Sequence, residues 1–266
     1  MQMDAVVALA HEAGRAIMAI YEAGADAAGV RTKDDQSPLT LADEASHAVI
    51  VAGLAKLTPD IPVISEEDSH PSAVAANALR WVVDPLDGTK EFVKRTNEFT
   101  VNIALVRGTT PIAGVVHAPA LGVTWVGDES GATRHEAGAR AVMRVTAQPS
   151  LTALRIVASK DHAGPAVRAM LDRMPEAQTL SMGSSIKFCL VAEGRADLYL
   201  RDGPTMEWDT AAAHAVLRAA GGDVLTLDGQ SLTYGKPDLR NPHFMAVGDL
   251  SVDWPSVVSS PDGRLL

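Results

Sequence analysis

Two carboxylates three residues apart form the most distinctive chemical feature of the chain. Asp84 and Asp87 stand in the segment Asp84–Thr89, which reads Asp-Pro-Leu-Asp-Gly-Thr. Pro85 biases Asp84 toward an extended conformation, and Gly88 permits a sharp turn. Two carboxylates with a backbone carbonyl between them are oxygen ligands of the kind that Mg²⁺ binds. The same residues also fit a surface turn whose aspartates only cap the next element, and the segment alone does not decide between the two interpretations.

Three further acidic side chains stand where they could join such a site. Glu66 follows the apolar strand pattern Ile61–Ile64, Asp209 directly precedes an alanine-rich helical run, and Asp43 lies on a helix opened by Thr40. Each also has an ordinary interpretation. Glu66 fits solvated charge at a strand end, Asp209 fits a helix N-cap, and Asp43 fits a solvated helix face. Taken singly, none of the three identifies a site.

The elements that must position these residues follow from the hydrophobic periodicity. Apolar residues recur at helical spacing from Val6 to Tyr21, and a second helix is predicted from Thr40 to Leu57. A meandering set of strands follows at Ile61–Ile64, Trp81–Val83, Thr100–Arg107, Ile112–His117 and Val123–Val126. Two of these strands run directly into carboxylates, at Glu66 and at Asp84.

The second half of the chain alternates between strands and helices. Strands are predicted at Arg155–Ser159, Asp197–Leu200 and Asp223–Thr226, and helices at Gly164–Met174, Ser185–Gly194 and Thr210–Ala220. This order is typical of an α/β layer, whereas the first half is of the α+β type. The pattern weakens around Arg140–Ser150. We therefore expect an N-terminal subdomain over 1–145, which carries most of the candidate ligands, and a C-terminal subdomain over 146–266, which carries Asp209.

Composition limits the class of protein. The chain has 266 residues, with 23 basic and 33 acidic side chains and a net charge of −10, which argues against nucleic-acid binding. The single cysteine excludes an intrachain disulfide and fits a reducing compartment. The chain begins without the pattern of a secretory signal, and no apolar run approaches the roughly 20 residues of a membrane span. We expect a soluble cytoplasmic protein, and the sequence leaves open whether it is a monomer or a homodimer.

Together, these motifs resemble the inositol monophosphatase superfamily. Within it the chain looks most like the CysQ-type 3'(2'),5'-bisphosphate nucleotidases. The segments that carry the resemblance are 65–67, 84–92, 97–105, 183–194 and 208–212, in the usual order and separations. The resemblance covers nearly the whole chain, from the first helix to Phe244. It implies the layered αβαβα sandwich of the sugar-phosphatase type.

The resemblance also implies how the acidic residues are used. Glu66, Asp84 and the Leu86 carbonyl would hold one Mg²⁺, and Asp84, Asp87 and Asp209 a second, with two or three ions in all. Asp43 and Thr89 would position the attacking water, with Glu66 also at the catalytic centre. Two metals suit an in-line phosphoryl displacement because they stabilise both the attacking and the leaving oxygen.

Residues for the substrate are implied less directly. Gly88 and Thr89 could offer backbone amides to the reacting phosphate at a helix start. The Ser-x-x-Lys pattern of the bisphosphate nucleotidases falls on Ser184 and Lys187. His162 stands in a segment similar to their phosphate-binding histidine segment. Arg201 is a further candidate for the same phosphate.

The function implied by the resemblance is hydrolysis of adenosine 3',5'-bisphosphate to AMP and phosphate by a metal-activated water. In the family this reaction clears a by-product of sulfate assimilation and is inhibited by lithium. Some relatives associate peripherally with the inner membrane. Two alternatives stay open: an inositol monophosphatase or sugar-bisphosphate phosphatase with the same metal chemistry, and a nucleotide or metal sensor that retains the fold but not the activity.

Overall fold

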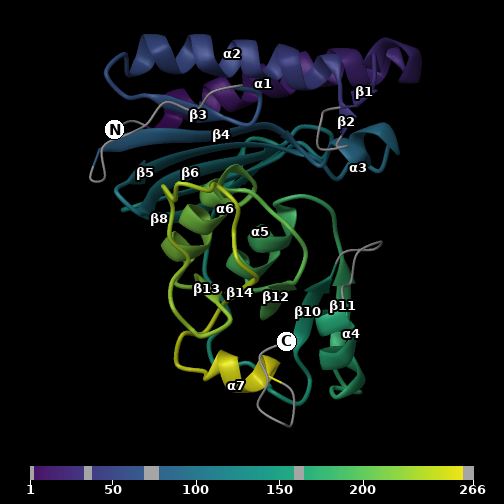
Figure 1. Ribbon diagram of the computed structural model, residues 1–266, viewed down its shortest axis with the longest axis vertical. Coiled ribbons are helices and arrows are strands. Elements are labelled where there is room, and N and C mark those ends of the chain that lie inside the picture. Colours follow the sequence, from purple (N-terminus) through teal and green to yellow (C-terminus); the bar gives the residue numbers. More distant parts are fainter. Residues whose placement is uncertain (1–2, 33–37, 69–77, 159–164, 260–266) are drawn as a thin grey trace.

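The protein folds into five stacked layers, shown in the computed structural model of Figure 1. The structure describes residues 3–32, 38–68, 78–158 and 165–259. Helices α1 (Met3–Ala23) and α2 (Leu41–Leu57) form the first layer, and a large sheet lies against them. Helices α5 (Ile186–Ala192) and α6 (Glu207–Ala220) separate this sheet from a second, smaller one. Helices α4 (Pro165–Asp172) and α7 (Trp254–Val258) cover the far side, which confirms the αβαβα sandwich.

The first sheet is the largest element that positions the candidate site. Within the described residues it has seven strands in the order β3-β4-β5-β6-β7-β8-β9. Their bounds are Val63–Ser65, Leu79–Asp87, Thr100–Arg107, Thr110–Ala118, Val123–Asp128, Gly131–Glu136 and Ala139–Met143. Strands β3 and β4 pair in parallel, and the other neighbours pair antiparallel. Helices cover both faces, so the central strands are apolar throughout rather than alternating.

Strand β4 extends further than the apolar pattern predicts. The expected strand ends at Val83, but β4 runs on to Asp87. Its pairing with β5 shifts in register between Asp84 and Asp87, which marks a bulge. A bulge bends a strand and redirects its side chains, and Pro85 fits there because it has no N–H to give to the ladder. The segment Asp84–Asp87 is therefore an irregular strand end rather than a turn after the strand.

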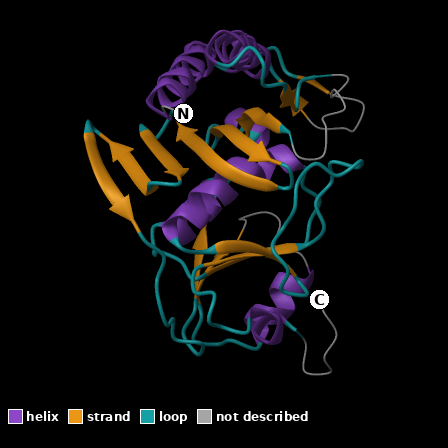
Figure 2. Cartoon of the chain, turned by 90° about the vertical axis from the view of Figure 1, so that its left-hand side faces the viewer, coloured by secondary structure: helices purple, strands orange, loops and turns teal. Residues whose placement is uncertain are grey.

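Helix α6 lies between the two sheets and approaches the first sheet closely (Figure 2). A Cβ on Gly114 of β6 would lie 2.2 Å from the Ala212 carbonyl oxygen. A Cβ on Gly127 of β7 would lie 2.5 Å from the Val216 Cα. These glycines and the alanine-rich helix face are therefore required for this packing. The helix begins at Glu207, three residues before the predicted start at Thr210.

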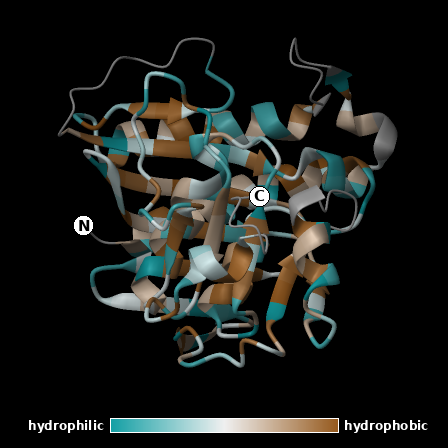
Figure 3. Cartoon of the chain, turned by 60° about the horizontal axis from the view of Figure 1, so that its bottom comes forward, coloured by the Kyte–Doolittle hydropathy of each residue, from teal (hydrophilic) through white to brown (hydrophobic). Residues whose placement is uncertain are grey.

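The second sheet has the order β11-β10-β12-β14-β13 within the described residues. Its strands are β10 (Arg155–Ala158), β11 (Gln178–Ser181), β12 (Leu198–Arg201), β13 (Asp223–Thr226) and β14 (Phe244–Val247). Smaller elements complete the described chain: a 3₁₀ turn at Ala25–Ala28, the hairpin β1 (Arg31–Thr32) and β2 (Pro38–Leu39), and α3 (Thr89–Val93). Figure 3 shows hydrophobic residues along the interior strands and helices and hydrophilic residues in many of the surrounding loops. None of the described helices has the length and apolar character that a membrane crossing requires.

Candidate metal and catalytic site

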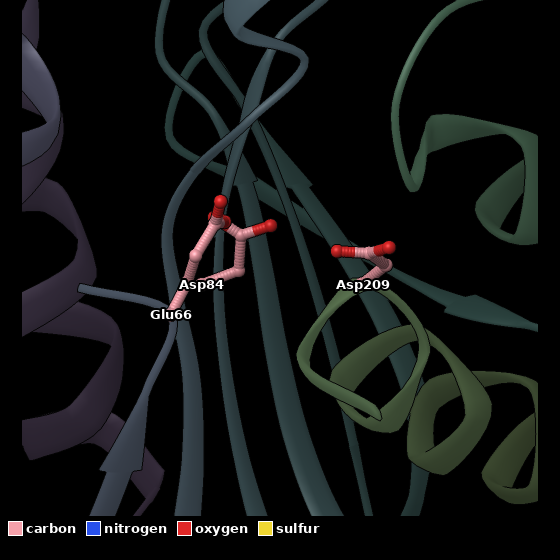
Figure 4. Close-up of side chains that lie close together, drawn as sticks. All are labelled: Glu66, Asp84 and Asp209. Carbon is pink, nitrogen blue, oxygen red and sulfur yellow. The ribbon is translucent and has the colours of Figure 1, made fainter. Parts of the chain in front are cut away.

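Three carboxylates from distant parts of the chain meet at one end of the first sheet. Ligand oxygens of Glu66, Asp84 and Asp209 all lie within 4.8 Å of one another. Figure 4 shows Glu66 and Asp84 side by side, with the Asp209 carboxylate directed toward them from the start of α6. Strands β3 and β4 are parallel neighbours, so they bring Glu66 and Asp84 to the same end of the sheet. The group is an arrangement of oxygen donors suited to a hard cation.

The electrostatics of Asp84 favour a bound cation. Its side chain is buried, and its Oδ1 accepts a hydrogen bond of 3.0 Å from the Leu86 amide. Burial raises the pKa of this carboxyl well above its usual value, and the negative charges of Glu66, Asp87 and Asp209 raise the pKa further. Because the neighbouring charges that raise this pKa are all carboxylates, a multivalent cation would relieve their repulsion.

Asp87 lies beside the group of three rather than within it. Its Oδ2 accepts hydrogen bonds from the Ser185 amide at 2.6 Å and the Ser185 hydroxyl at 2.7 Å. The same oxygen lies 3.3 Å from the Asn102 amide nitrogen and 3.5 Å from the Thr100 hydroxyl. One oxygen of Asp87 is thus held by backbone and side-chain donors, which leaves its other oxygen for a ligand.

Asp43 and Thr89 meet as the family resemblance implied. The Thr89 hydroxyl lies 3.4 Å from Asp43 Oδ1 and 3.3 Å from the Leu86 carbonyl oxygen. Asp43 is 1% exposed, so its interpretation as part of a solvated helix face is wrong. It occupies the third position of α2, and its Oδ2 accepts from the Thr40 amide at 2.8 Å in a capping box.

Asp209 repeats this arrangement on α6. Because the helix begins at Glu207, Asp209 is the third residue of the first turn and not the N-cap. Its Oδ2 accepts a 2.8 Å hydrogen bond from the Met206 amide. Burial, followed by the charges of Asp87 and Glu66, raises the pKa of the Asp209 carboxyl well above its usual value. The carboxylate thus caps the helix with one oxygen while it takes part in the acidic group.

Ser185 and Asn102 make contacts with the acidic residues of this site that the sequence did not predict. The Ser185 hydroxyl lies 2.7 Å from the Asp209 carbonyl oxygen as well as from Asp87, and it accepts from Asn102 Nδ2 at 2.9 Å. Ser185 therefore links the two acidic segments. The residues stand 24 and 98 positions apart in the chain. No local pattern in the sequence signals such a contact.

A cleft of about 480 Å³ opens beside the acidic group. Its walls include Asp87, Gly88, Ser184, Lys187, Arg201 and Asp209. Gly88 must be glycine because its φ is +92° and a Cβ would lie 3.1 Å from the Glu98 carbonyl oxygen. The cleft is therefore lined by two of the expected metal residues, Asp87 and Asp209, and by four of the expected substrate residues, Gly88, Ser184, Lys187 and Arg201.

Two basic side chains and an unusual serine stand out in this cleft. Lys187 is buried, its Nζ donates to the Ser184 carbonyl at 2.7 Å, and burial lowers its pKa to about 8. Arg201 donates to the Pro204 carbonyl at 3.2 Å. Ser184 adopts a left-handed conformation with a φ of +45°, and its buried hydroxyl has no hydrogen-bond partner among the described residues. His162, a further expected substrate residue, lies outside the described residues.

Comparison with known proteins identifies the family. A family model described as the inositol monophosphatase family matches residues 2–248 of the chain. The chain belongs to the inositol monophosphatase family. This membership explains why the acidic motifs, far apart in sequence, occur in one order and meet in one place.

Several similar members of the inositol monophosphatase family share one name. A relative from Escherichia coli named 3'(2'),5'-bisphosphate nucleotidase CysQ is 49% identical over 245 residues, 91% of this chain and 98% of the relative. A relative of the same name from Haemophilus influenzae is 34% identical over 260 residues, 96% of each chain. The crystal structure of CysQ from Bacteroides thetaiotaomicron matches with a TM-score of 0.80 and 37% identity, over 93% of this chain and 98% of that one. An inositol monophosphatase from Thermotoga maritima shares the fold, with a TM-score of 0.78 and 24% identity over 97% and 96% of the two chains.

Proposed function

We propose that the protein is a Mg²⁺-dependent phosphomonoester hydrolase that converts adenosine 3',5'-bisphosphate to AMP and phosphate. The observation that carries this proposal is the position of the acidic group, which adjoins a cleft that also contains Lys187 and Arg201. An acidic group suits cation-assisted attack on one phosphate, and separate basic residues suit recognition of another. The names of the relatives from Escherichia coli and Haemophilus influenzae support the same substrate.

The acidic residues fit Mg²⁺ as their cofactor. We assign Glu66, Asp84 and the Leu86 carbonyl to one ion, and Asp84, Asp87 and Asp209 to another, with two or three ions in all. These donors are all oxygens, and the raised pKa of Asp84 supports a cation among them. When bound, Mg²⁺ neutralises charge on the phosphoryl oxygens and makes a water molecule more acidic.

The chain's own residues orient the attack. The Thr89 hydroxyl and the Asp43 carboxylate, 3.4 Å apart, can each form a hydrogen bond to one water molecule and so orient it for attack. We assign Glu66 to the same catalytic centre. The amides of Gly88 and Thr89, at the start of α3, can donate to the phosphoryl oxygens as negative charge moves onto them. This arrangement requires no nucleophilic side chain.

The second phosphate of the substrate would bind to basic residues that line the same cleft. Lys187 and Arg201 both line the cavity and are the basic groups available there for a phosphate dianion, together with Lys90. The Ser184 hydroxyl, buried and without a partner among the described residues, would donate to the same phosphate. We include His162 in this subsite by resemblance alone. In this scheme residues 1–145 supply most of the metal ligands, while residues 146–266 supply Asp209 and select the substrate.

Several further properties complete the proposal. We propose a cytoplasmic enzyme of sulfur metabolism that is inhibited by lithium, acts as a monomer or homodimer, and could associate peripherally with the inner membrane. The absence of a membrane-crossing helix among the described residues is compatible with this assignment. The substrate is a small nucleotide rather than nucleic acid.

A phosphate-release panel with Mg²⁺ tests the proposal. It would compare adenosine 3',5'-bisphosphate, adenosine 3'-phosphate, inositol 1-phosphate and fructose 1,6-bisphosphate. We expect the highest kcat/KM for the adenosine bisphosphate, with Lys187→Met lowering it for this substrate but not for the adenosine monophosphate. A preference for the inositol or sugar phosphate would overturn the substrate assignment. No release from any of them would favour a sensor that retains the fold.

A further inference from the structure

A row of buried polar side chains adjoins the first turn of α6. The His214 Nε2 lies 2.5 Å from Asp223 Oδ1, and the His214 Nδ1 lies 2.9 Å from the Tyr234 hydroxyl. The Tyr234 hydroxyl in turn lies 3.2 Å from the Thr210 hydroxyl. His214, Tyr234 and Thr210 are each at most 1% exposed. We call Asp223, His214, Tyr234 and Thr210 the α6 polar row.

The row ends at the residue next to Asp209. Thr210 and His214 are four residues apart in α6, so they lie on one face of the helix, and Tyr234 bridges them. Thr210 also lines the cleft. Asp223 Oδ1 can accept from His214 Nε2, and the Tyr234 hydroxyl donates to the Thr210 hydroxyl while it lies within hydrogen-bonding distance of His214 Nδ1. Each polar group in the row therefore has a partner despite its burial.

The segment that supplies Tyr234 holds the same turn at other points. Asn241 Nδ2 donates to the Met206 carbonyl at 2.7 Å and to the Thr210 hydroxyl at 3.1 Å. The buried carboxylate of Glu207 accepts from the Gly235 amide at 2.8 Å. The first turn of α6 is therefore hydrogen-bonded to this segment and, through the Asp209 carbonyl oxygen, to the Ser185 hydroxyl.

The position of the Asp209 carboxylate depends on these hydrogen bonds more than the positions of Glu66 and Asp84 do. Glu66 and Asp84 lie on or directly after neighbouring strands of one sheet, whose hydrogen-bonded ladder sets their separation. Asp209 reaches the group from a helix, so its distance from them depends on where the first turn of α6 lies. A displacement of about 1 Å is enough to impair a catalytic arrangement.

We propose that Tyr234, His214 and Asp223 are positioning residues that set Asp209 against Glu66 and Asp84 and thereby set the affinity of the site for its cation. This inference rests on the proposed role of Asp209 as a metal ligand. None of the three residues touches the substrate or the ion. They act through Thr210 and the first turn of α6.

The test measures metal binding directly, with Mn²⁺ as the probe and the free ion followed by its paramagnetic resonance signal. Tyr234→Phe removes one hydroxyl and keeps the ring. We expect it to weaken Mn²⁺ binding about threefold to tenfold, which corresponds to the loss of one buried hydrogen bond. The matched control is Thr124→Val, which removes a buried hydroxyl on β7 that contacts His11 and His117 at 2.8 and 2.9 Å. The control should lower the melting temperature in EDTA and leave the Mn²⁺ affinity unchanged.

Wild-type Mn²⁺ affinity in a folded Tyr234→Phe protein would overturn the inference, since a purely structural role changes only the melting temperature. If Tyr234→Phe does not fold, Asp223→Asn decides the question, because its side chain is 16% exposed and similar in volume to the original. We expect a weakening of about twofold to threefold there, and unchanged affinity would again refute the role. Phosphate release by the wild-type protein is measured separately, so failure of the proposed function is distinguished from failure of this inference.

Discussion

Ser184 gives a prediction in which stability and activity move in opposite directions. The residue combines a φ of +45° with a buried hydroxyl that has no partner among the described residues. Both features cost free energy in the protein without substrate, and both are explained if the hydroxyl donates to a substrate phosphate. Ser184→Gly should therefore stabilise the substrate-free protein while weakening substrate binding.

The magnitude follows from the two costs and their offsets. Relief of the left-handed conformation contributes about 1–2 kcal/mol, and removal of the unsatisfied hydroxyl contributes about 1 kcal/mol. Against this, glycine adds about 0.5–1 kcal/mol of chain entropy to the unfolded state, and loss of the buried Cβ costs about 0.8 kcal/mol. The net gain is about 1 kcal/mol, which raises the melting temperature by about 2–4 °C for a domain of this size. The lost hydrogen bond to a phosphate dianion costs about 1.5–3 kcal/mol, so kcat/KM should fall by about 10- to 100-fold.

The assay pairs calorimetry in EDTA with initial rates of phosphate release from adenosine 3',5'-bisphosphate. Ser184→Ala is the matched variant, because it removes the hydroxyl and keeps the Cβ in the left-handed conformation. We expect it to lose activity as Ser184→Gly does but to gain less stability. A Ser184→Gly protein that melts at a lower temperature than wild type, or that keeps the wild-type kcat/KM, would refute this reasoning.

Three further predictions concern the metal residues and pH. Asp87→Asn should reduce kcat by at least about 1000-fold, because the oxygen that binds the ion is lost. Its circular dichroism should stay native, because the amide oxygen can still accept from Ser185. Wild-type turnover would contradict the ligand assignment. Thr89→Val should lower kcat about 10- to 100-fold with little change in Mn²⁺ affinity, and equal kcat in the two proteins would show that Thr89 does not orient the water. The pKa of Lys187 is lowered to about 8, mainly by burial, so its positive charge is lost as the pH rises through that value. The KM for adenosine 3',5'-bisphosphate should therefore rise between pH 7 and pH 9, whereas a parallel rise for adenosine 3'-phosphate would argue against Lys187 as the cause.

Local sequence patterns predicted the elements better than the contacts between them. Strands β5 and β13 match their predicted bounds because each is a compact apolar run bounded by turns. Strands β8 and β9 were not predicted, since β9 is largely exposed and lacks an apolar face. Strand β11 was also not predicted, because its residues are mostly exposed and only its pairing with β10 makes it a strand.

The candidate site shows the same contrast between local patterns, which the sequence predicts, and tertiary contacts, which it does not. The ordinary interpretation of Asp209 was a helix N-cap and that of Asp43 a solvated helix face, whereas each accepts a hydrogen bond from the N-cap amide at the third position of its helix. The approach of both carboxylates to other acidic groups depends on tertiary packing and could not be predicted locally. The links made by Ser185 need Asp87, which is 98 residues away. The family resemblance, rather than the periodicity, led us to expect that Asp43, Asp87 and Asp209 belong to one site.

The way in which the aspartates are anchored bears on which ion the site prefers. In Asp43, Asp84, Asp87 and Asp209, one carboxylate oxygen accepts a backbone N–H, from Thr40, Leu86, Ser185 and Met206 in turn. The three proposed ligands among them, Asp84, Asp87 and Asp209, are therefore predisposed to bind an ion through a single oxygen. Ca²⁺ takes six to eight oxygens and often binds carboxylates through both oxygens, whereas Mg²⁺ requires a compact octahedron. Single-oxygen binding by anchored carboxylates disfavours the larger ion, so discrimination between the two would come from the backbone that holds the ligands.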